Sequence, residues 1–195
     1  QRRLEQAGVK TIGLADKLSS ENTLIIKGND GIQAGILAAS SVIDNNYPSQ
    51  DLYAGYDEEQ ICGAVKALSH KCDVVVVVLH WGREGDAKAG KSQKESAGRI
   101  ISAGAHLIVG HHPHVFFEVE RRGAGSVAYS LGNFVFDLPW DRKLRSSGIL
   151  DVRINRKTGL DSCEIWPVKL NLRGLPVAGR SPVPVSSDLT VFNLY

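Results

Sequence analysis

The stretch VVVVVLH at residues 74–80 decides the fold. A continuous run of β-branched residues, without apolar and polar alternation, is typical of a parallel strand that is buried on both faces. This run ends in His80. A second apolar run, LIV at residues 107–109, leads directly into the sequence GHHPH at residues 110–114. Two predicted strands therefore carry histidines at their carboxyl ends.

Amphipathic segments precede these two strands. Residues 57–69 carry Ile61, Val65 and Leu68 at helical spacing, and acidic residues in the first turn favour the positive end of the helix dipole. Residues 91–103 predict a second helix. The order helix, strand, helix, strand is typical of parallel crossover units, so the sequence predicts an α/β fold.

The remaining segments read mainly as strands and turns. The sequence Gly-Asn-Asp-Gly at residues 28–31 predicts a hairpin turn, because these residue types tolerate positive φ. Residues 176–195, which include Pro182 and Pro184, predict an extended carboxyl-terminal arm. We further expect a helix at 1–7, strands at 9–15, 23–27 and 32–39, a loop at 45–55, and consecutive antiparallel strands at 115–120, 127–130, 148–155 and 160–170.

Composition argues against several classes of partner. The chain has 195 residues, 43% of them hydrophobic, which is enough for a domain with a packed core. Its 23 basic and 21 acidic residues give a net charge of +2, and no basic block with interleaved aromatic residues points to nucleic acid or to an anionic membrane. The longest apolar run is too short to cross a bilayer, and no signal-peptide pattern is present. We expect a soluble chain whose membrane attachment, if any, uses a segment outside it.

The cysteines point to no site of their own. Cys62, Cys72 and Cys163 make an odd number without a CxxC motif, so they predict neither a disulfide framework nor a thiolate metal site. We expect buried or half-buried thiols. Their disulfide state and the redox compartment stay open at the level of sequence.

Histidines mark the candidate site. In open α/β sheets the ligand crevice lies beyond the carboxyl ends of the strands, so His80 should open onto the same edge as His111, His112 and His114. Residues two apart in an extended segment point in opposite directions, but Pro113 makes a turn plausible here. Neutral imidazole is a common metal ligand. A structural role for these histidines remains the alternative to metal binding, because a histidine after a strand often serves as a capping or core residue.

Three motifs follow one another in a specific order. They are HWG at residues 80–82 with Glu84 close behind, SAGAHLIVGHHPHV at residues 102–115, and YSLGNF at residues 129–134. Together they resemble the poly-γ-glutamate capsule-synthesis (CapA) family, which is similar to calcineurin-like metallophosphoesterases. The resemblance is dense over residues 73–137 and weaker over residues 8–40.

This resemblance implies a fold and a metal centre. The fold is a four-layer αββα metallophosphoesterase-like sandwich, incomplete here at the amino terminus, with residues 1–175 as the carboxyl-terminal portion of the domain and 176–195 as the arm. The centre holds divalent metal ions, Mn, Fe or Zn, two in the complete protein. By the resemblance, the metal ligands in this chain are His80, His112 and His114.

Three further residues match family positions in the same cleft. Glu84, His111 and Asn133 would contact substrate or form a hydrogen bond to a ligand histidine. A turn cap for Asn133 and a solvated charge for Glu84 are the alternative roles, and at position 111 the family accepts other residues. None of these is the catalytic acid, which the family carries in an amino-terminal half together with carboxylate ligands.

The chain also departs from the family pattern. His106 stands where the family usually has aspartate, and Gly85 stands where it usually has an aromatic residue. We expect His106, at the start of a strand, and His70, at the end of a helix, to be structural.

Three classes of function remain open. The first is a metal-dependent hydrolase that acts on a phosphoester or on an amide such as a glutamyl linkage. The second is a non-catalytic capsule-assembly or polymer-binding component, against which the net charge of only +2 argues weakly. The third is a fragment whose histidines bind nothing.

The expected setting follows from the resemblance as well. We expect an anionic polymer or phosphoester substrate, other capsule-synthesis proteins as partners, and a location outside the cytoplasm at the bacterial cell surface. Because the carboxylate half lies elsewhere, this chain by itself is expected to bind at most one metal ion weakly and to show no turnover.

Overall fold

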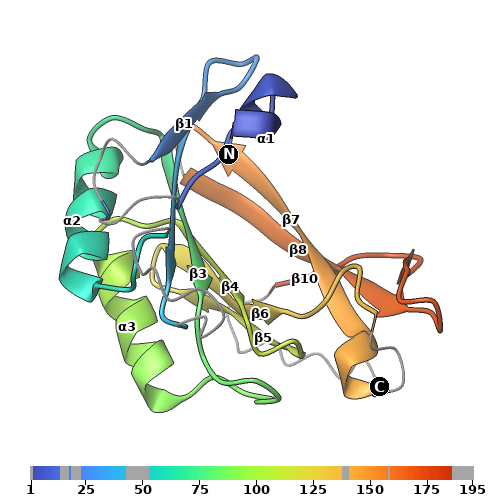
Figure 1. The fold of residues 1–195 in the computed structure, drawn as a ribbon. Helices are drawn as coiled ribbons and strands as arrows, with labels where there is room; N and C mark the ends of the chain where they lie inside the picture. Colours follow the sequence, from blue (N-terminus) through green and yellow to red (C-terminus); the bar gives the residue numbers. More distant parts are fainter. Residues whose placement is uncertain are drawn as a thin grey trace.

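The computed structural model describes residues 2–13, 18, 23–42, 53–137, 141–157 and 159–185. At its centre is a six-stranded sheet in which β2, β3, β4 and β6 run parallel and each edge strand runs antiparallel to its neighbour (Figure 1). In spatial order the strands are β1 (Leu24–Lys27), β2 (Gln33–Ser40), β3 (Val74–His80), β4 (Leu107–His111), β6 (Gly125–Leu131) and β5 (Phe116–Arg122).

The parallel strands end in register at one edge of this sheet. His80, the last residue of β3, lies opposite Ser40 of β2 and His111 of β4. Within β3, Val75, Val77 and Leu79 are fully buried. These three side chains point to one face; on the other face Val74 is buried, whereas Val76 and Val78 are half-buried. The predicted strand is confirmed, its burial is complete on one face only, and the carboxyl ends of β3 and β4 meet at the same edge of the sheet.

Two helices cover one face of the sheet (Figure 1). They are α2 (Glu58–Ser69) and α3 (Lys91–Ser102). α2 begins after Asp57, whose carboxylate accepts a hydrogen bond of 3.1 Å from the backbone N–H of Gln60 and so satisfies one of the free N–H groups of the first turn. Ile61, Val65 and Leu68 are buried, so the helical face read from the sequence is the face that packs on the sheet.

A second sheet lies against the opposite face of the first (Figure 1). Its strands are β7 (Ser146–Asn155), β8 (Gly159–Leu170), β9 (Pro176–Ala178) and β10 (Val183–Pro184), with β8 paired to each of the others. Phe116, Val119, Ala128 and Ile165 form an apolar cluster between the two sheets. The described residues thus supply a helical layer and two sheet layers of the expected sandwich, and the α/β fold class is confirmed.

The strands after His114 do not form one meander. β5 and β6 pair antiparallel, but β6 also pairs parallel with β4, whereas β7 and β8 belong to the second sheet. The described part of the predicted arm, residues 176–185, contributes β9 and β10, which pair with β8. Residues 186–195 lie outside the described part of the chain.

The strand predicted at residues 9–15 is wrong for the part that the structure describes. After the short helix α1 (Arg2–Gln6), the N–H of Val9 donates back to the carbonyl oxygen of Leu4 at 2.8 Å, and residues 9–13 form no strand. An alternating pattern alone is not sufficient, because a strand needs a neighbour to pair with. Residues 14 and 15, and residues 45–52 of the predicted loop, lie outside the described residues.

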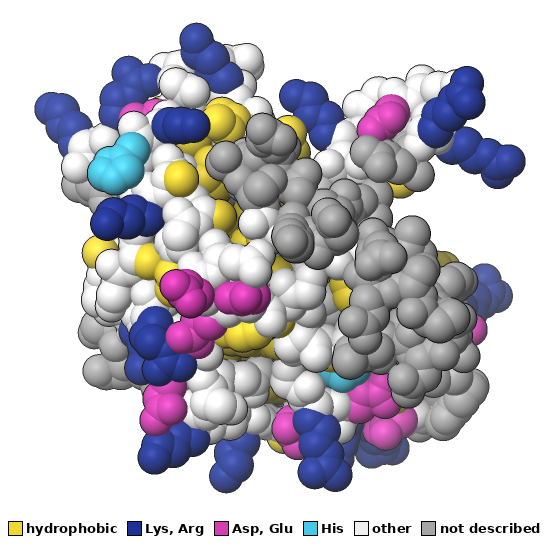
Figure 2. Space-filling model, turned by 60° about the vertical axis from the view of Figure 1, so that its left-hand side comes forward, with side chains coloured by type: hydrophobic (Ala, Val, Ile, Leu, Met, Phe, Trp, Pro, Cys, Tyr) yellow, Lys and Arg dark blue, Asp and Glu magenta, His cyan; other side chains and the backbone are white. Residues whose placement is uncertain are grey.

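The cysteines are buried or half-buried, as expected from the sequence. Cys72 and Cys163 are buried, Cys62 is half-buried, and all three thiols are free. On the face that carries the helices, basic and acidic side chains are interspersed (Figure 2). None of the helices in the described ranges is long and apolar enough to span a membrane.

Candidate metal centre

A sharp turn after β4 carries the histidine cluster. Gly110 must be glycine, because a Cβ atom there would overlap the carbonyl oxygen of Tyr129 and the indole nitrogen of Trp81. His112 and His114 have φ values of 101° and 61°, which non-glycine residues rarely adopt. Such strained conformations concentrate at functional sites. The turn brings both imidazoles to the same side of the backbone, as the sequence interpretation required.

His112 faces His80 across the ends of β3 and β4. The Nδ1 atom of His112 lies 3.1 Å from the Nε2 atom of His80, and the ring centroids are 4.8 Å apart. Two nitrogen ligands about 2.1 Å from one ion, at an angle of about 90–109°, are about 3.0–3.4 Å apart. This spacing fits shared coordination of one metal ion, and it fits equally well a hydrogen bond between the two rings when one of the facing nitrogen atoms carries a proton.

Asn133 fixes the orientation of His114. The side-chain amide of Asn133 donates to the carbonyl oxygens of His114 and Leu144, each at 3.1 Å. Its Oδ1 atom lies 2.7 Å from the Nδ1 atom of His114, so Nδ1 must be the donor and carry the proton. The Nε2 atom of His114 then keeps its lone pair available for a metal ion.

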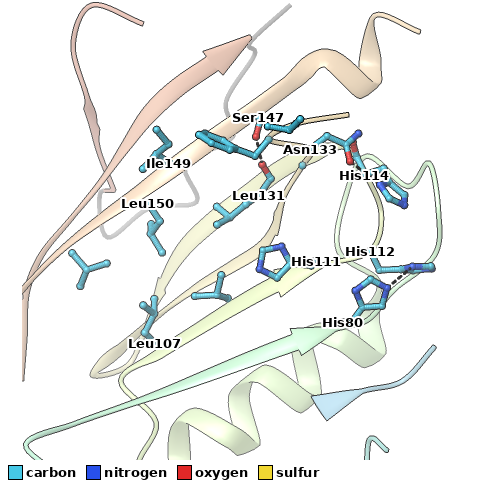
Figure 3. Close-up of a pocket in the computed structure, with 16 residues that line it drawn as sticks. His80, Leu107, His111, His112, His114, Leu131, Asn133, Ser147, Ile149 and Leu150 are labelled. Carbon is cyan, nitrogen blue, oxygen red and sulfur yellow. Dashed lines mark hydrogen bonds between the residues drawn. The ribbon is translucent and has the colours of Figure 1, made fainter. Parts of the chain in front are cut away.

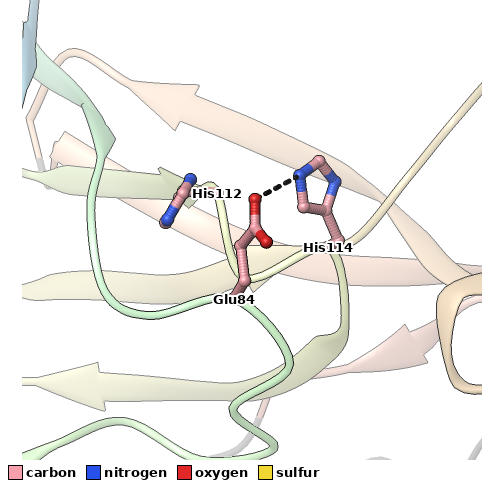
Figure 4. A group of neighbouring side chains, drawn as sticks. All are labelled: Glu84, His112 and His114. Carbon is pink, nitrogen blue, oxygen red and sulfur yellow. Dashed lines mark ion pairs between the residues drawn. The ribbon is translucent and has the colours of Figure 1, made fainter. Parts of the chain in front are cut away.

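Glu84 completes the group of candidate ligands. Its carboxylate lies between the imidazoles of His112 and His114 (Figure 4), and Oε1 is 3.9 Å from the Nε2 atom of His114. One donor atom from each of these three residues lies within 4.8 Å of the others. The N–H of Gly85 donates to the carbonyl oxygen of Pro113 at 3.0 Å and so ties the loop after β3 to the histidine turn.

The electrostatics favour neutral imidazoles. Burial lowers the pKa of His80, and His112, His111 and His114 lower it further. Burial also lowers the pKa of His112. The negative charge of Glu84 opposes this shift, because it favours the protonated ring. Because only neutral imidazole binds a metal ion, these shifts keep His80 and His112 in the binding form at neutral pH.

The histidines lie at the mouth of a cleft between the two sheets (Figure 3). The cleft encloses about 640 Å³, and its deeper walls are apolar. His111 lines this cleft beside Leu131, apart from the pair formed by His80 and His112 (Figure 3). Burial lowers the pKa of His111. Apolar side chains from both sheets make up the rest of the wall: Leu107, Val109, Leu131, Ile149, Leu150 and Val152.

The structure thus groups Glu84, His112 and His114, places His80 against His112, and bonds Asn133 to His114. His111 lines the same cleft but is not in that group. His106 accepts a hydrogen bond of 3.2 Å at Nδ1 from the N–H of Val75, which agrees with a structural role.

Sequence reasoning missed Phe136, whose ring stacks on the imidazole of His114 with centroids 5.2 Å apart. The YSLGNF motif breaks off two residues earlier, and nothing in the spacing of the following residues indicates which of them turns inward.

The chain resembles known proteins over most of its length. Residues 1–138 match the family described as Bacterial capsule synthesis protein PGA_cap. The PGA biosynthesis protein CapA of Bacillus subtilis (strain 168) is 35% identical over 132 residues, which cover 68% of this chain and 32% of that protein. The capsule biosynthesis protein CapA of Bacillus anthracis is 29% identical over 198 residues, which cover 98% of this chain and 46% of that protein. The chain therefore spans a third to a half of these relatives.

Two solved structures share the fold. A putative 5′-nucleotidase from Staphylococcus aureus matches with a TM-score of 0.53 at 17% identity, over 89% of this chain and 33% of that chain. The sulfate thiohydrolase SoxB from Thermus thermophilus matches with a TM-score of 0.51 at 15% identity, over 90% of this chain and 30% of that chain. At these identities the likeness concerns the fold alone.

Proposed function

The chain belongs to the PGA_cap family of bacterial capsule synthesis proteins, and on that premise we propose that it acts in poly-γ-glutamate capsule biosynthesis and supplies the histidine side of a divalent-metal hydrolase centre. The curated relatives of the same family are named for capsule and PGA biosynthesis, which supports the pathway and a role at the cell surface. The observation that carries the metal centre is the 3.1 Å approach of His80 to His112.

The available donor atoms fit a divalent ion. His80 and His112 would hold it through Nε2 and Nδ1, because these atoms already face each other. His114 would use Nε2, which Asn133 leaves free by binding Nδ1. Glu84 adds one carboxylate beside His112 and His114. A set of imidazoles with one carboxylate suits Zn or Fe and, with further oxygen ligands, Mn.

A bound divalent metal centre would lower the pKa of a coordinated water molecule and stabilise negative charge on an attacked phosphoryl or carbonyl group. The chain's own residues have positioning roles in this scheme. Asn133 holds the His114 ring in one tautomer, and the bond from Gly85 to Pro113 holds Glu84 beside the histidines. The substrate would be a phosphoester or an amide of the anionic polymer, and a second ion would need ligands from elsewhere in the complete protein.

Metal binding by the chain itself tests this proposal. Titration with Co²⁺, followed by its visible spectrum and by calorimetry, should show binding that the His112→Ala variant weakens by at least about tenfold. The matched control is His70→Ala, which removes an exposed histidine at the carboxyl-terminal end of α2. Equal Co²⁺ affinity in wild type and in both variants would contradict the proposed centre.

Hydrolysis separates the catalytic proposal from the non-catalytic alternative. The assay uses the longest form of the protein that the organism produces, with poly-γ-glutamate and with a generic phosphodiester as substrates. Metal-dependent release of product that chelation abolishes supports a hydrolase. Tight polymer binding without any product would instead support a polymer-binding component of capsule assembly.

A further inference from the structure

Phe136 contacts His114 on the face of its ring. The two rings stack with centroids 5.2 Å apart and planes tilted by 28°. Asn133 holds the same imidazole at its edge through the 2.7 Å contact with Nδ1. An edge hydrogen bond and a face contact restrict different rotations of the ring. Together they hold His114 more firmly than either contact alone.

Phe136 differs from the apolar residues before it. Phe134 and Val135 expose 51% and 66% of their surfaces, whereas Phe136 is half-buried. Its backbone explains this difference. The N–H of Phe136 donates to the carbonyl oxygen of Gly174 at 3.1 Å, which anchors the segment after β6 to the turn after β8.

That turn accepts only glycine where it meets Phe136. Gly174 is buried and has a φ of 72°, and a Cβ atom there would overlap the carbonyl oxygen of Phe136. Asn171 stabilises the turn, because its Oδ1 atom accepts hydrogen bonds from the N–H groups of Arg173 and Leu175 at 2.8 and 3.1 Å. The position of the Phe136 backbone is therefore set from the second sheet.

From these contacts we propose that Phe136 is a positioning residue for His114 and that the Gly174 turn is its remote support. The inference rests on the proposed metal centre, because a fixed His114 ring matters most if its Nε2 atom binds a metal ion. Outer contacts that orient ligand histidines contribute to metal affinity, and their loss typically costs about 10–100-fold. The Gly174 turn thus links the second sheet to the site through one aromatic ring.

The test begins with the metal-free protein. Long-range ¹H–¹⁵N NMR spectra of the histidine rings should show the Nδ1-protonated tautomer of His114 with a slowly exchanging proton. Phe136→Leu should speed this exchange and broaden the ring signals, whereas Phe136→Tyr should keep both features. Co²⁺ titration of the same variants should show a loss of about tenfold for Phe136→Leu and full retention for Phe136→Tyr.

A glycine pair tests the remote support. Gly174→Ala should reproduce the effects of Phe136→Leu on the His114 signals and on Co²⁺ affinity. Gly123→Ala is the matched control, because Gly123 also has a positive φ, of 58°, but a Cβ atom there meets nothing within 4 Å. Near-UV circular dichroism confirms that each variant is folded. If Gly174→Ala does not fold, the two Phe136 variants decide the proposal.

The outcomes distinguish failure of the positioning role of Phe136 from failure of the proposed metal centre. Unchanged His114 signals in a folded Phe136→Leu variant would overturn the positioning role, whatever the metal titration shows. Failure of the wild type to bind Co²⁺ would overturn the proposed metal centre, while the metal-free spectra still decide whether Phe136 orients His114.

Discussion

The Nδ1 atom of His112 lies 3.1 Å from the Nε2 atom of His80, although these residues are 32 positions apart in the chain. The register between β3 and β4 accounts for this approach, since it places His80 opposite His111, directly before the turn to His112. Two imidazoles with facing nitrogen atoms and no proton to share repel each other through their lone pairs. A bound cation or a shared proton relieves that repulsion.

Metal retention should depend on pH. The pKa values of His80 and His112 are lowered, first of all by burial, so these rings stay neutral to a lower pH than a free histidine with its pKa of about 6.5. Affinity should therefore fall only at a lower pH than for ligands with the pKa of free histidine, as the pH drops through the lowered values. Elemental analysis after dialysis at successively lower pH, starting from pH 8, measures this, and a loss of metal that is already half complete above about pH 6.5 would contradict the prediction.

Replacing Glu84 by glutamine should weaken Co²⁺ binding by about tenfold, because a carboxylate beside two imidazoles is lost while the shape of the side chain is kept. The same change should lower the pKa of His112 further, since the Glu84 charge raises it. NMR titration of the His112 ring measures the second effect without metal. Glu59→Gln, an exposed change on α2, is the control. An unmoved His112 titration would show that Glu84 is only a solvated charge.

Replacing Asn133 by leucine should destabilise the protein by about 2–4 kcal/mol. The side chain is only 7% exposed, and its loss leaves the carbonyl oxygens of His114 and Leu144 without their amide donor. Urea unfolding measures the free energy. Asn29→Ala, an exposed change in the β1–β2 turn, should stay within about 0.5 kcal/mol of wild type. A cost as small as that of the control would contradict the role of Asn133 as the donor to these two carbonyl oxygens.

Two glycine-to-alanine changes should have opposite signs. At Gly110 the added methyl group overlaps the backbone of Tyr129 and the Trp81 indole, so we expect a loss of at least about 3 kcal/mol. At Gly63, in the middle of α2 with nothing within 4 Å, alanine should stabilise the protein by up to about 1 kcal/mol through its higher helix propensity. Thermal unfolding compares the two, and equal melting temperatures would refute the close-approach argument for Gly110.

The sequence predicted those parts of the site that depend on strand order. A short run of five valines favours a buried parallel strand, and the helix–strand alternation favours β3 and β4 as neighbours, so the meeting of His80 with the GHHPH turn could be predicted from local patterns. A turn was expected from Gly110 and Pro113, but Gly110 lies inside β4, and the positive φ values of the turn belong to His112 and His114. The sequence left the role of Asn133 open between a turn cap and a bond to a histidine, and the structure shows the bond to His114 together with a contact to the carbonyl oxygen of Leu144.

Other features depend on contacts that no local pattern encodes. The stacking of Phe136 on His114 requires Gly174, which lies beyond the whole length of β7 and β8. The division of the later strands between two sheets depends on which strands pair with which. β6 pairs with β4 as well as with β5, and local sequence patterns do not encode such a choice of partner. The strand expected at residues 9–15 is absent over residues 9–13, the part that the structure describes, because alternation alone does not supply a pairing partner.

The alignment of Ser40, His80 and His111 across three strands also limits how this chain can vary in length. Side chains in a strand alternate between the two faces of the sheet, so inserting or deleting one residue inside β3 or β4 would turn the terminal histidine to the wrong face. Insertions or deletions in the segments that carry α2 and α3 do not change which face the terminal histidines point to. Homologous chains that keep these histidines should therefore differ in length only outside β3 and β4.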